Sequence, residues 1–216
     1  MIEVDKEVEA VQREVGTGRI AAGEARTVRL RREYNAEIQD VWDALTNPSR
    51  IGRWFLPISG DFRLGGSYQF EGNAGGQIVA CERPNRLLVT WAYGDASDPA
   101  SVSELEVRLT AAGDHATVFE LLHTAVVPDE MWTQFGPGAV GVGWDMGLLG
   151  LALHLGDGSE PATPAEKEAW QLSDEGKQFA SLSSEAWGEA SRAAGADPKT
   201  VAGNIAATTA FYTGNA

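Results

Sequence analysis

The fold is decided by residues 137–155, PGAVGVGWDMGLLGLALHL, which form the longest apolar run in the chain. A helix of this length is roughly 28 Å long, near the lower limit for crossing a bilayer. The run therefore either spans a membrane or forms the central helix of a globular domain. Its one full charge is Asp145, and five glycines interrupt it: Gly138, Gly141, Gly143, Gly147 and Gly150.

On a helical wheel a narrow stripe of small residues runs along this segment. Because a glycine inside a helix costs about 1 kcal/mol relative to alanine, the stripe indicates either a close neighbour or open space. Asp145 lies on the opposite side, where we expect an outward-facing or paired carboxylate. The stripe holds Gly143, Gly147, Gly150 and His154, flanked by Trp144, Leu148, Leu151 and Leu155 on one side and by Val142, Met146, Leu149 and Leu153 on the other.

The composition describes a globular protein. The chain has 216 residues, 43% of them apolar, and a net charge of −14, which argues against nucleic acid and anionic membranes as main partners. The apolar run lacks flanking Lys/Arg anchors and aromatic belts, so we expect no membrane span. One cysteine, Cys81, excludes an intrachain disulfide. The charged N-terminus lacks the apolar core of a signal peptide, and we therefore expect a cytoplasmic location.

Upstream of the apolar run the pattern is that of an antiparallel β-domain. Residues 27–34 alternate as a half-buried strand. An amphipathic helix over 36–45 and a short helix over 49–55 follow, separated by the breaker Asn47-Pro48. Successive hairpins imply one sheet with one buried face, for which the 137–155 helix is the natural cover. Further strands are expected at 61–64, 67–71, 77–82, 86–93, 102–110 and 116–126, and a short helix at 129–134.

The two ends differ from this central domain. We expect a short exposed helix over 4–15, ended by Gly16, and a linker over 156–161. Helices are then expected at 164–172, continuing in pieces to 179, and at 183–194 and 198–212, the last with Asp197 as its N-cap and Pro198 in its first turn. The division is therefore an N-terminal helical extension (1–26), a central domain (27–155) and a helical C-terminal extension (156–216).

Residues 27–155 resemble the START-like, Bet v 1-like (SRPBCC) superfamily, and most closely its bacterial branch related to the C-terminal domain of the activator of Hsp90 ATPase. The resemblance rests on six segments taken together. They are Asn35-Ala36-Glu37-Ile38 with 41–46 (VWDALT), 51–55 (IGRWF), 61–66 (DFRLGG), 83–91 (RPNRLLVTW), Leu121-Leu122-His123 and Gly143-Trp144.

The resemblance implies an α+β helix-grip fold. In that fold a curved antiparallel sheet, here of about six or seven strands, wraps around a long C-terminal helix, and two short helices follow the first strand. Members bind lipids, hormones, polyketides or unknown ligands between sheet and helix, and a few are cyclases or hydrolases. Eukaryotic Hsp90 activators carry an additional N-terminal domain with an Asn- and Trp-rich motif. This sequence shows neither, so the resemblance does not extend to Hsp90 stimulation.

Few residues are candidates for catalysis or for binding a metal ion. His123 is expected to face the cavity, and the hydrogen-bonded core histidine is favoured over a polar anchor or general base for a ligand. His154 suits the helix C-terminus, and His115 is expected to be exposed. Cys81 is expected to be a small packing residue. The three histidines and the cysteine form no metal-ligand pattern, and no nucleotide or nucleophile motif occurs, so no metal and no cofactor are expected.

We therefore predict a protein that binds a small hydrophobic ligand; the sequence does not decide whether it catalyses a reaction, and it favours binding without catalysis. The alternatives are a cyclase or hydrolase of the same fold that uses His123, and a co-chaperone-like interaction module, with a homodimer formed through the terminal extensions as a further option. The predicted ligand-binding residues are Trp42, Trp54, Tyr68, Phe70, Trp91, Phe119, Leu121, His123, Trp144, Gly147 and Leu151.

Overall fold

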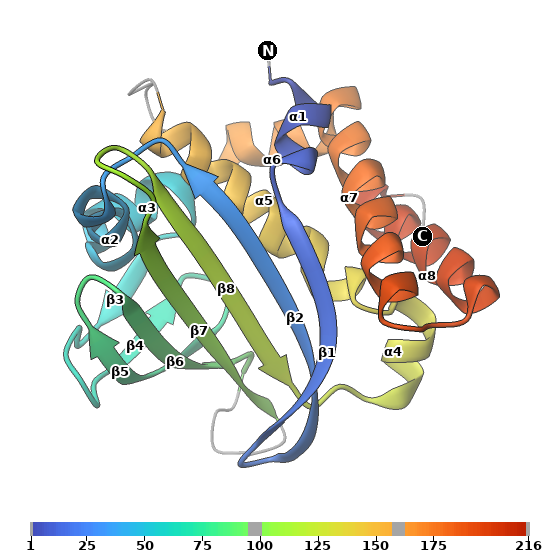
Figure 1. The fold of residues 1–216 in the computed structure, drawn as a ribbon, viewed down its shortest axis with the longest axis horizontal. Helices are drawn as coiled ribbons and strands as arrows, with labels where there is room; N and C mark the ends of the chain where they lie inside the picture. The colour runs from blue at the N-terminus through green and yellow to red at the C-terminus, as the bar shows by residue number, and fades with distance from the viewer. Residues whose placement is uncertain (1, 95–100, 157–162, 215–216) are drawn as a thin grey trace.

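The computed structural model describes residues 2–94, 101–156 and 163–214. Most of the linker expected at 156–161 lies outside these ranges. The described chain forms one curved, open antiparallel sheet with helices against one face (Figure 1). Its eight strands follow the order β1-β2-β8-β7-β6-β5-β4-β3. Their bounds are β1 Gln12–Ile20, β2 Gly23–Tyr34, β3 Ile58–Gly60, β4 Ser67–Phe70, β5 Gly75–Glu82, β6 Arg86–Ala92, β7 Val102–Ala111 and β8 Thr117–Ala125.

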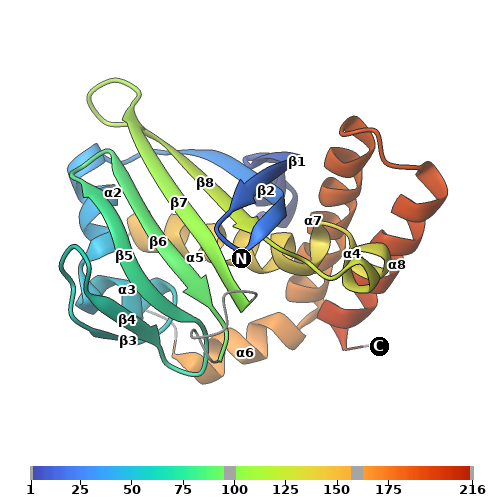
Figure 2. The ribbon, with the colours of Figure 1, turned by 90° about the horizontal axis from the view of Figure 1, so that it is seen from below.

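The long apolar run forms α5, Gly138–Leu155, which lies across the face of the sheet (Figure 2). The short helices α2 (Ile38–Thr46) and α3 (Pro48–Trp54) connect β2 to β3. This is the α+β helix-grip architecture that the sequence predicts. The remaining helices are α1 Val4–Glu9, α4 Asp129–Phe135, α6 Pro164–Leu172, α7 Asp174–Ala193 and α8 Pro198–Thr213.

Strand register explains the buried face of the sheet. Leu105 and Val107 of β7 stand opposite His123 and Leu121 of β8, and Val107 also stands opposite Leu87 of β6. Side chains alternate between the two faces of a strand, so these pairs form apolar rows on the face that α5 covers. The alternation predicted for 102–110 is confirmed: Ser103, Leu105, Val107 and Leu109 are all buried.

The N-terminal segment corrects the sequence prediction. The helix expected over 4–15 ends at Glu9, and β1 then pairs along its whole length with β2, from Gln12 opposite Arg31 to Ile20 opposite Gly23. A helix of this length is marginal on its own, and Gly16 and Gly18 prevent it from being extended at low cost, whereas pairing with β2 satisfies the backbone. The sheet therefore has eight strands rather than six or seven.

Two smaller differences concern other segments. The strand expected at 61–64 is a loop, and the strand before it is β3, Ile58–Gly60. Backbone bonds between Asp61 and Arg63 and between Arg63 and Gly66 close this loop on itself. The helices expected up to 179 and from 183 are one continuous helix, α7, which begins at the N-cap Ser173.

The glycines of α5 let neighbouring helices approach closely. A Cβ at Gly141 would lie 2.2 Å from the Trp187 ring of α7, and one at Gly150 would lie 2.6 Å from the Trp54 carbonyl oxygen of α3. A Cβ at Gly143 would lie 3.3 Å from the Tyr212 hydroxyl oxygen of α8. At Gly147 the nearest atoms are those of the Phe55 ring, at an ordinary 3.8 Å. Most glycines of α5 thus allow a neighbouring helix to pack closely, whereas at Gly147 there is space for a side chain.

Asp145 is paired and wholly buried, rather than outward-facing. Its side chain has a relative exposure of 0%, and Arg13 of β1 binds it through two nitrogens, Nε and Nη2, each 3.0 Å from a carboxylate oxygen. The Ser183 hydroxyl and the Trp187 indole N–H of α7 also donate to it. Burial raises the pKa of this carboxyl, and the Arg13 charge opposes the rise. The network joins β1, α5 and α7.

Among the described residues, α5 is the one helix long and apolar enough to cross a membrane by length and composition. Its packing is that of a core helix. Val142 and Leu148 belong to the main hydrophobic core under the sheet, and Leu149 packs with Val4, Val8 and Phe179 of α1 and α7. Both flanks of the helix are thus in contact with protein.

Replacing Arg13 with methionine should lower the free energy of unfolding by about 3–5 kcal/mol, because the Asp145 carboxylate would stay buried without its countercharge. Urea unfolding measures the change. The control is Arg29→Met, which removes an exposed pair with Glu14 at 3.8 Å and should cost about 0–1 kcal/mol. Equal losses in the two variants would contradict the role given to Arg13.

Candidate functional site

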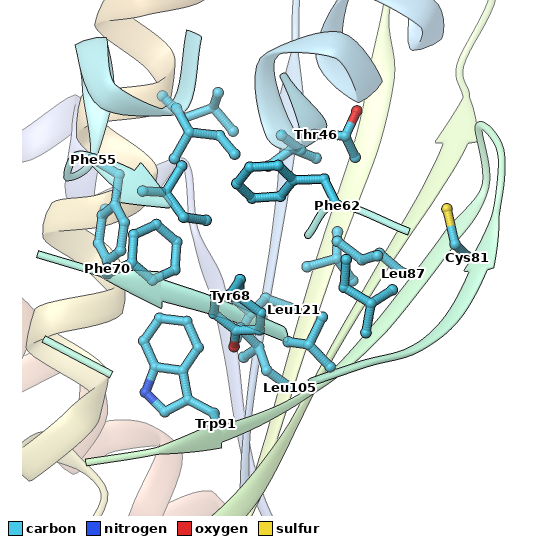
Figure 3. Close-up of a pocket in the computed structure, with 18 of the residues that line it drawn as sticks. Thr46, Phe55, Phe62, Tyr68, Phe70, Cys81, Leu87, Trp91, Leu105 and Leu121 are labelled. Atoms are coloured by element: carbon cyan, nitrogen blue, oxygen red, sulfur yellow. The ribbon is translucent and has the colours of Figure 1, made fainter. Parts of the chain in front are cut away.

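A cavity of about 190 Å³ lies between α5, the α2–α3 segment and the sheet (Figure 3). Its walls come from strands β3 to β8, from three helices and from the loop after β3. The lining is almost wholly apolar. It consists of Leu45, Thr46, Ile51, Trp54, Phe55, Ile58, Phe62, Arg63, Leu64, Tyr68, Phe70, Ile78, Cys81, Leu87, Val89, Trp91, Leu105, Val107, Phe119, Leu121, Trp144, Gly147, Leu148 and Leu151.

The two ends of the cavity differ. Phe55, Phe70 and Trp91 lie together on the side toward α5, Cys81 lies on the far side of the lining from them, and Phe62 lies between, beside Thr46 (Figure 3). Phe62 and Cys81 are exposed to solvent, and so is the neighbouring lining residue Leu64. We call this exposed part of the lining, formed by residues 62–64 and Cys81, the mouth.

Phe55 organises the closed end. It follows the last residue of α3, and its backbone leaves helical geometry there (φ −112°, ψ −103°). Its ring packs edge-on against Phe70 at a centroid distance of 5.0 Å and is stacked with Trp144 at 6.5 Å. Its carbonyl oxygen accepts a hydrogen bond from the half-buried Lys167 ammonium of α6, at 3.0 Å. The C-terminal extension therefore holds a wall of the cavity in place.

The polar atoms of the aromatic lining are mostly engaged with the protein. The Tyr68 hydroxyl donates to the Thr90 carbonyl at 2.7 Å, and burial raises its pKa. The Trp54 indole N–H donates to the Ala44 carbonyl at 2.9 Å. The Trp91 indole nitrogen is buried with no partner among the described residues. The interior thus presents mainly carbon surface and ring faces, with few polar atoms.

His123 is a hydrogen-bonded core histidine and does not line the cavity. The Trp144 indole N–H donates to its Nδ1 at 3.1 Å. Nδ1 is therefore unprotonated, so Nε2 carries the proton and donates to the Ser103 hydroxyl at 2.8 Å. That hydroxyl in turn donates to the Trp91 carbonyl at 2.7 Å. Burial lowers the pKa of His123 to about 4. The expectation that His123 faces the cavity is therefore wrong, because the Trp144 indole covers it.

The structure brings most of the predicted ligand-binding residues to one cavity. Trp42, however, is buried in the core under α2 and does not line it. The residues among the eleven predicted that do line it are Trp54, Tyr68, Phe70, Trp91, Phe119, Leu121, Trp144, Gly147 and Leu151.

The other chemical candidates lie in varied places. His154 contacts the Arg50 guanidinium through its Nε2 at 3.1 Å, and burial together with the Arg50 charge lowers its pKa. His115 is exposed, as expected. Cys81 is an exposed residue at the mouth rather than an interior packing residue. Within the described ranges no group of three or more His, Cys, Asp or Glu side chains could hold a metal ion.

Sequence reasoning missed several lining residues. Leu87 and Val89 follow from strand alternation with Trp91, and Leu105 and Val107 share the face of Ser103. Phe55 has no such periodic signal, because it lies outside α3 and reaches the cavity through the turn that follows. The mouth residues 62–64 were expected in a strand, and only the observed loop brings their side chains over the opening.

A curved sheet that holds a long helix, with an apolar cavity between them, defines the chain as a helix-grip domain of the SRPBCC class. Residues 35–156, more than half of the chain, match the family described as Activator of Hsp90 ATPase homolog 1-like protein. The chain belongs to this family. No functionally curated protein matches it significantly.

Solved structures agree with this assignment. The crystal structure of CalU16 from Micromonospora echinospora is 37% identical, with a TM-score of 0.59, over 81% of this chain and 98% of that chain. The solution structure of CalU16 gives 34% identity and a TM-score of 0.66 over 90% and 97% of the two chains. Protein MLL2253 from Mesorhizobium loti, at 22% identity and a TM-score of 0.51 over 59% of this chain and 95% of that chain, shares the fold. The similarity to CalU16 extends beyond the segment that matches the family.

The low pKa of His123 should make stability depend on pH. Between pH 6.5 and about 4, His123 is protonated in the unfolded chain but stays neutral in the folded protein. As pH falls through this window, the free energy of unfolding should therefore decrease by up to about 3 kcal/mol. His123→Gln keeps an acceptor for Trp144 and a donor for Ser103, and it should remove this part of the loss. Urea unfolding at several pH values measures both proteins. Identical pH dependence would contradict the assignment.

Proposed function

We propose that this protein binds a small hydrophobic molecule, lipid-, polyketide- or aromatic-like, in the cavity between α5 and the sheet. The observation that supports this most directly is the cavity itself. It is about 190 Å³ in volume, and its lining contains one charged residue, Arg63. A dry apolar cavity of about 150 Å³ is already large enough to bind benzene. Ligand sites are typically concave and lined by apolar and aromatic side chains.

The local structure supports a preformed site rather than a packing defect. Gly147 leaves α5 without a side chain where the helix faces Phe55, although glycine weakens a helix interior. The wall at Phe55 is anchored from outside by Lys167. An ordinary core would gain stability by filling this volume, at roughly 24 cal/mol per Å³. A cavity kept open at such a cost is consistent with an occupant.

The enzyme alternative has little support in the site. His123, its proposed acid–base residue, is separated from the cavity by Trp144, and both of its ring nitrogens are engaged. A general base must lie within hydrogen-bond reach of the group it deprotonates. The co-chaperone alternative rests on the family description alone, and no feature of the described surface favours it.

Gly147→Leu should abolish binding while keeping the fold. A Cβ at this position meets Phe55 at an ordinary 3.8 Å, so the leucine side chain can extend into the cavity. The probe is the neutral fluorophore N-phenyl-1-naphthylamine, whose emission rises in apolar surroundings. The wild type should show saturable enhancement and the variant none, with a melting temperature equal to or above that of the wild type, because a helix glycine has been replaced and the cavity filled.

The matched control is Val140→Leu, an equally apolar change at an exposed position of the same helix, which should leave probe binding unchanged. Undiminished enhancement in Gly147→Leu would refute binding at this site. Native mass spectrometry of the freshly purified wild type and Gly147→Leu proteins adds an independent test, since a co-purified small molecule should appear in the wild type alone.

The homodimer through the terminal extensions stays a prediction. In the structure β1 pairs with β2, and α7 packs against α5 of the same chain through Trp187. A dimer formed through these elements would therefore use their outward faces. Light scattering of the full chain measures the mass, and a monomeric mass over the accessible concentration range would reject the dimer.

A further inference from the structure

Arg63 is the one charged residue in the cavity lining, and it lies at the mouth between Phe62 and Leu64. Its position is fixed by the backbone of its loop. The Arg63 N–H donates to the Asp61 carbonyl and the Gly66 N–H donates to the Arg63 carbonyl, both at 2.8 Å. The Gly65 N–H, also at 2.8 Å, ties the loop to Ile78 of β5. A cation is therefore held beside an apolar opening.

Within the described lining, the interior offers an acceptor group of a ligand no accessible free donor. The Tyr68 hydroxyl and the Trp54 and Trp144 indole N–H groups already donate to protein acceptors. The Trp91 nitrogen has no partner but is sealed off within the wall. A polar group buried without a hydrogen bond costs free energy, so a ligand should place its polar group at the mouth and its apolar part inside.

The guanidinium of Arg63 has capacity for an anion. Its Nε donates to the Asp61 carboxylate at 2.6 Å, and both side chains are largely exposed, at 76% and 52%. Such an exposed ion pair contributes little. Among the described residues the terminal nitrogens of Arg63 have no other partner, and a guanidinium can bind a carboxylate through two parallel hydrogen bonds. The net charge of −14 acts weakly here, because charges beyond about 8 Å are screened at physiological ionic strength.

We propose that the ligand class is a monocarboxylate amphiphile, with its apolar chain in the cavity and its carboxylate at Arg63. The inference rests on the proposed binding function and goes further by fixing the charge and the orientation of the ligand. The cavity volume suits a short chain, about eight carbons, since about 150 Å³ accommodates a benzene ring.

Three probes with the same chain test the charge: octanoate, octanol and octyltrimethylammonium. Each competes with N-phenyl-1-naphthylamine for the wild type, Arg63→Gln and the control Arg29→Gln, whose arginine lies on β2 away from the lining. Octanoate should displace the fluorophore at the lowest concentration from the wild type and the control. Arg63→Gln should weaken octanoate roughly tenfold, as expected for a lost charge-assisted hydrogen bond, and leave octanol unchanged.

The outcomes separate this inference from the proposed function. If the fluorophore binds but octanol or octyltrimethylammonium competes as well as octanoate, the carboxylate assignment is wrong and the binding site stands. The same conclusion follows if octanoate fails to compete, or if the two arginine variants behave alike. If the fluorophore does not bind the wild type at all, the proposed function fails and this inference fails with it.

Discussion

The buried ion pair between Arg13 and Asp145 is the interaction on which the arrangement of the whole chain depends. Among the described residues it is the one ion pair that α5 makes, and its partners come from both terminal segments, β1 and α7. A carboxylate buried this deeply is tolerated only when its lone pairs are satisfied, and here they are satisfied by four donors from three side chains. The interaction thus fixes the rotation of α5 about its axis and, with it, which residues face the sheet.

That rotation determines the cavity. With Asp145 directed at β1 and α7, the face carrying Trp144, Gly147 and Leu151 must meet the sheet. Gly150 then packs against the Trp54 carbonyl and Gly141 against the Trp187 ring. The absence of side chains at these glycines lets α5 approach α3 and α7 closely. The extensions are therefore part of the mechanism that positions the site.

The sequence was most informative where periodicity is strong, in β7, β8 and α5. Nine of the residues it selected do line the cavity, and the aromatic ones among them come mainly from α3, β4 and β6. The predictions from sequence were wrong where contacts between residues far apart in the chain determine the structure. Residues 12–20 form a strand because they pair with β2, and no local sequence pattern in that stretch predicts this pairing. His123 shares a face with Leu121, yet the indole of Trp144, twenty-one residues later, decides that it does not reach the cavity. Such outcomes depend on neighbours distant in the chain, which a single sequence does not reveal.

Apart from the buried Trp91 indole nitrogen, the donors of the aromatic lining are engaged within the protein, and this bears on the selectivity of the proposed ligand site. An apolar wall discriminates between molecules by their length and width. One methylene group changes the binding free energy by only about 1–3 kcal/mol. Such a wall cannot discriminate between related compounds that differ only in a functional group outside it, because it contacts only their apolar chains. The proposed ligand site should therefore admit a graded series of related compounds rather than a single one. In the cell, the occupant would then be set as much by which of these compounds is most abundant as by the protein itself.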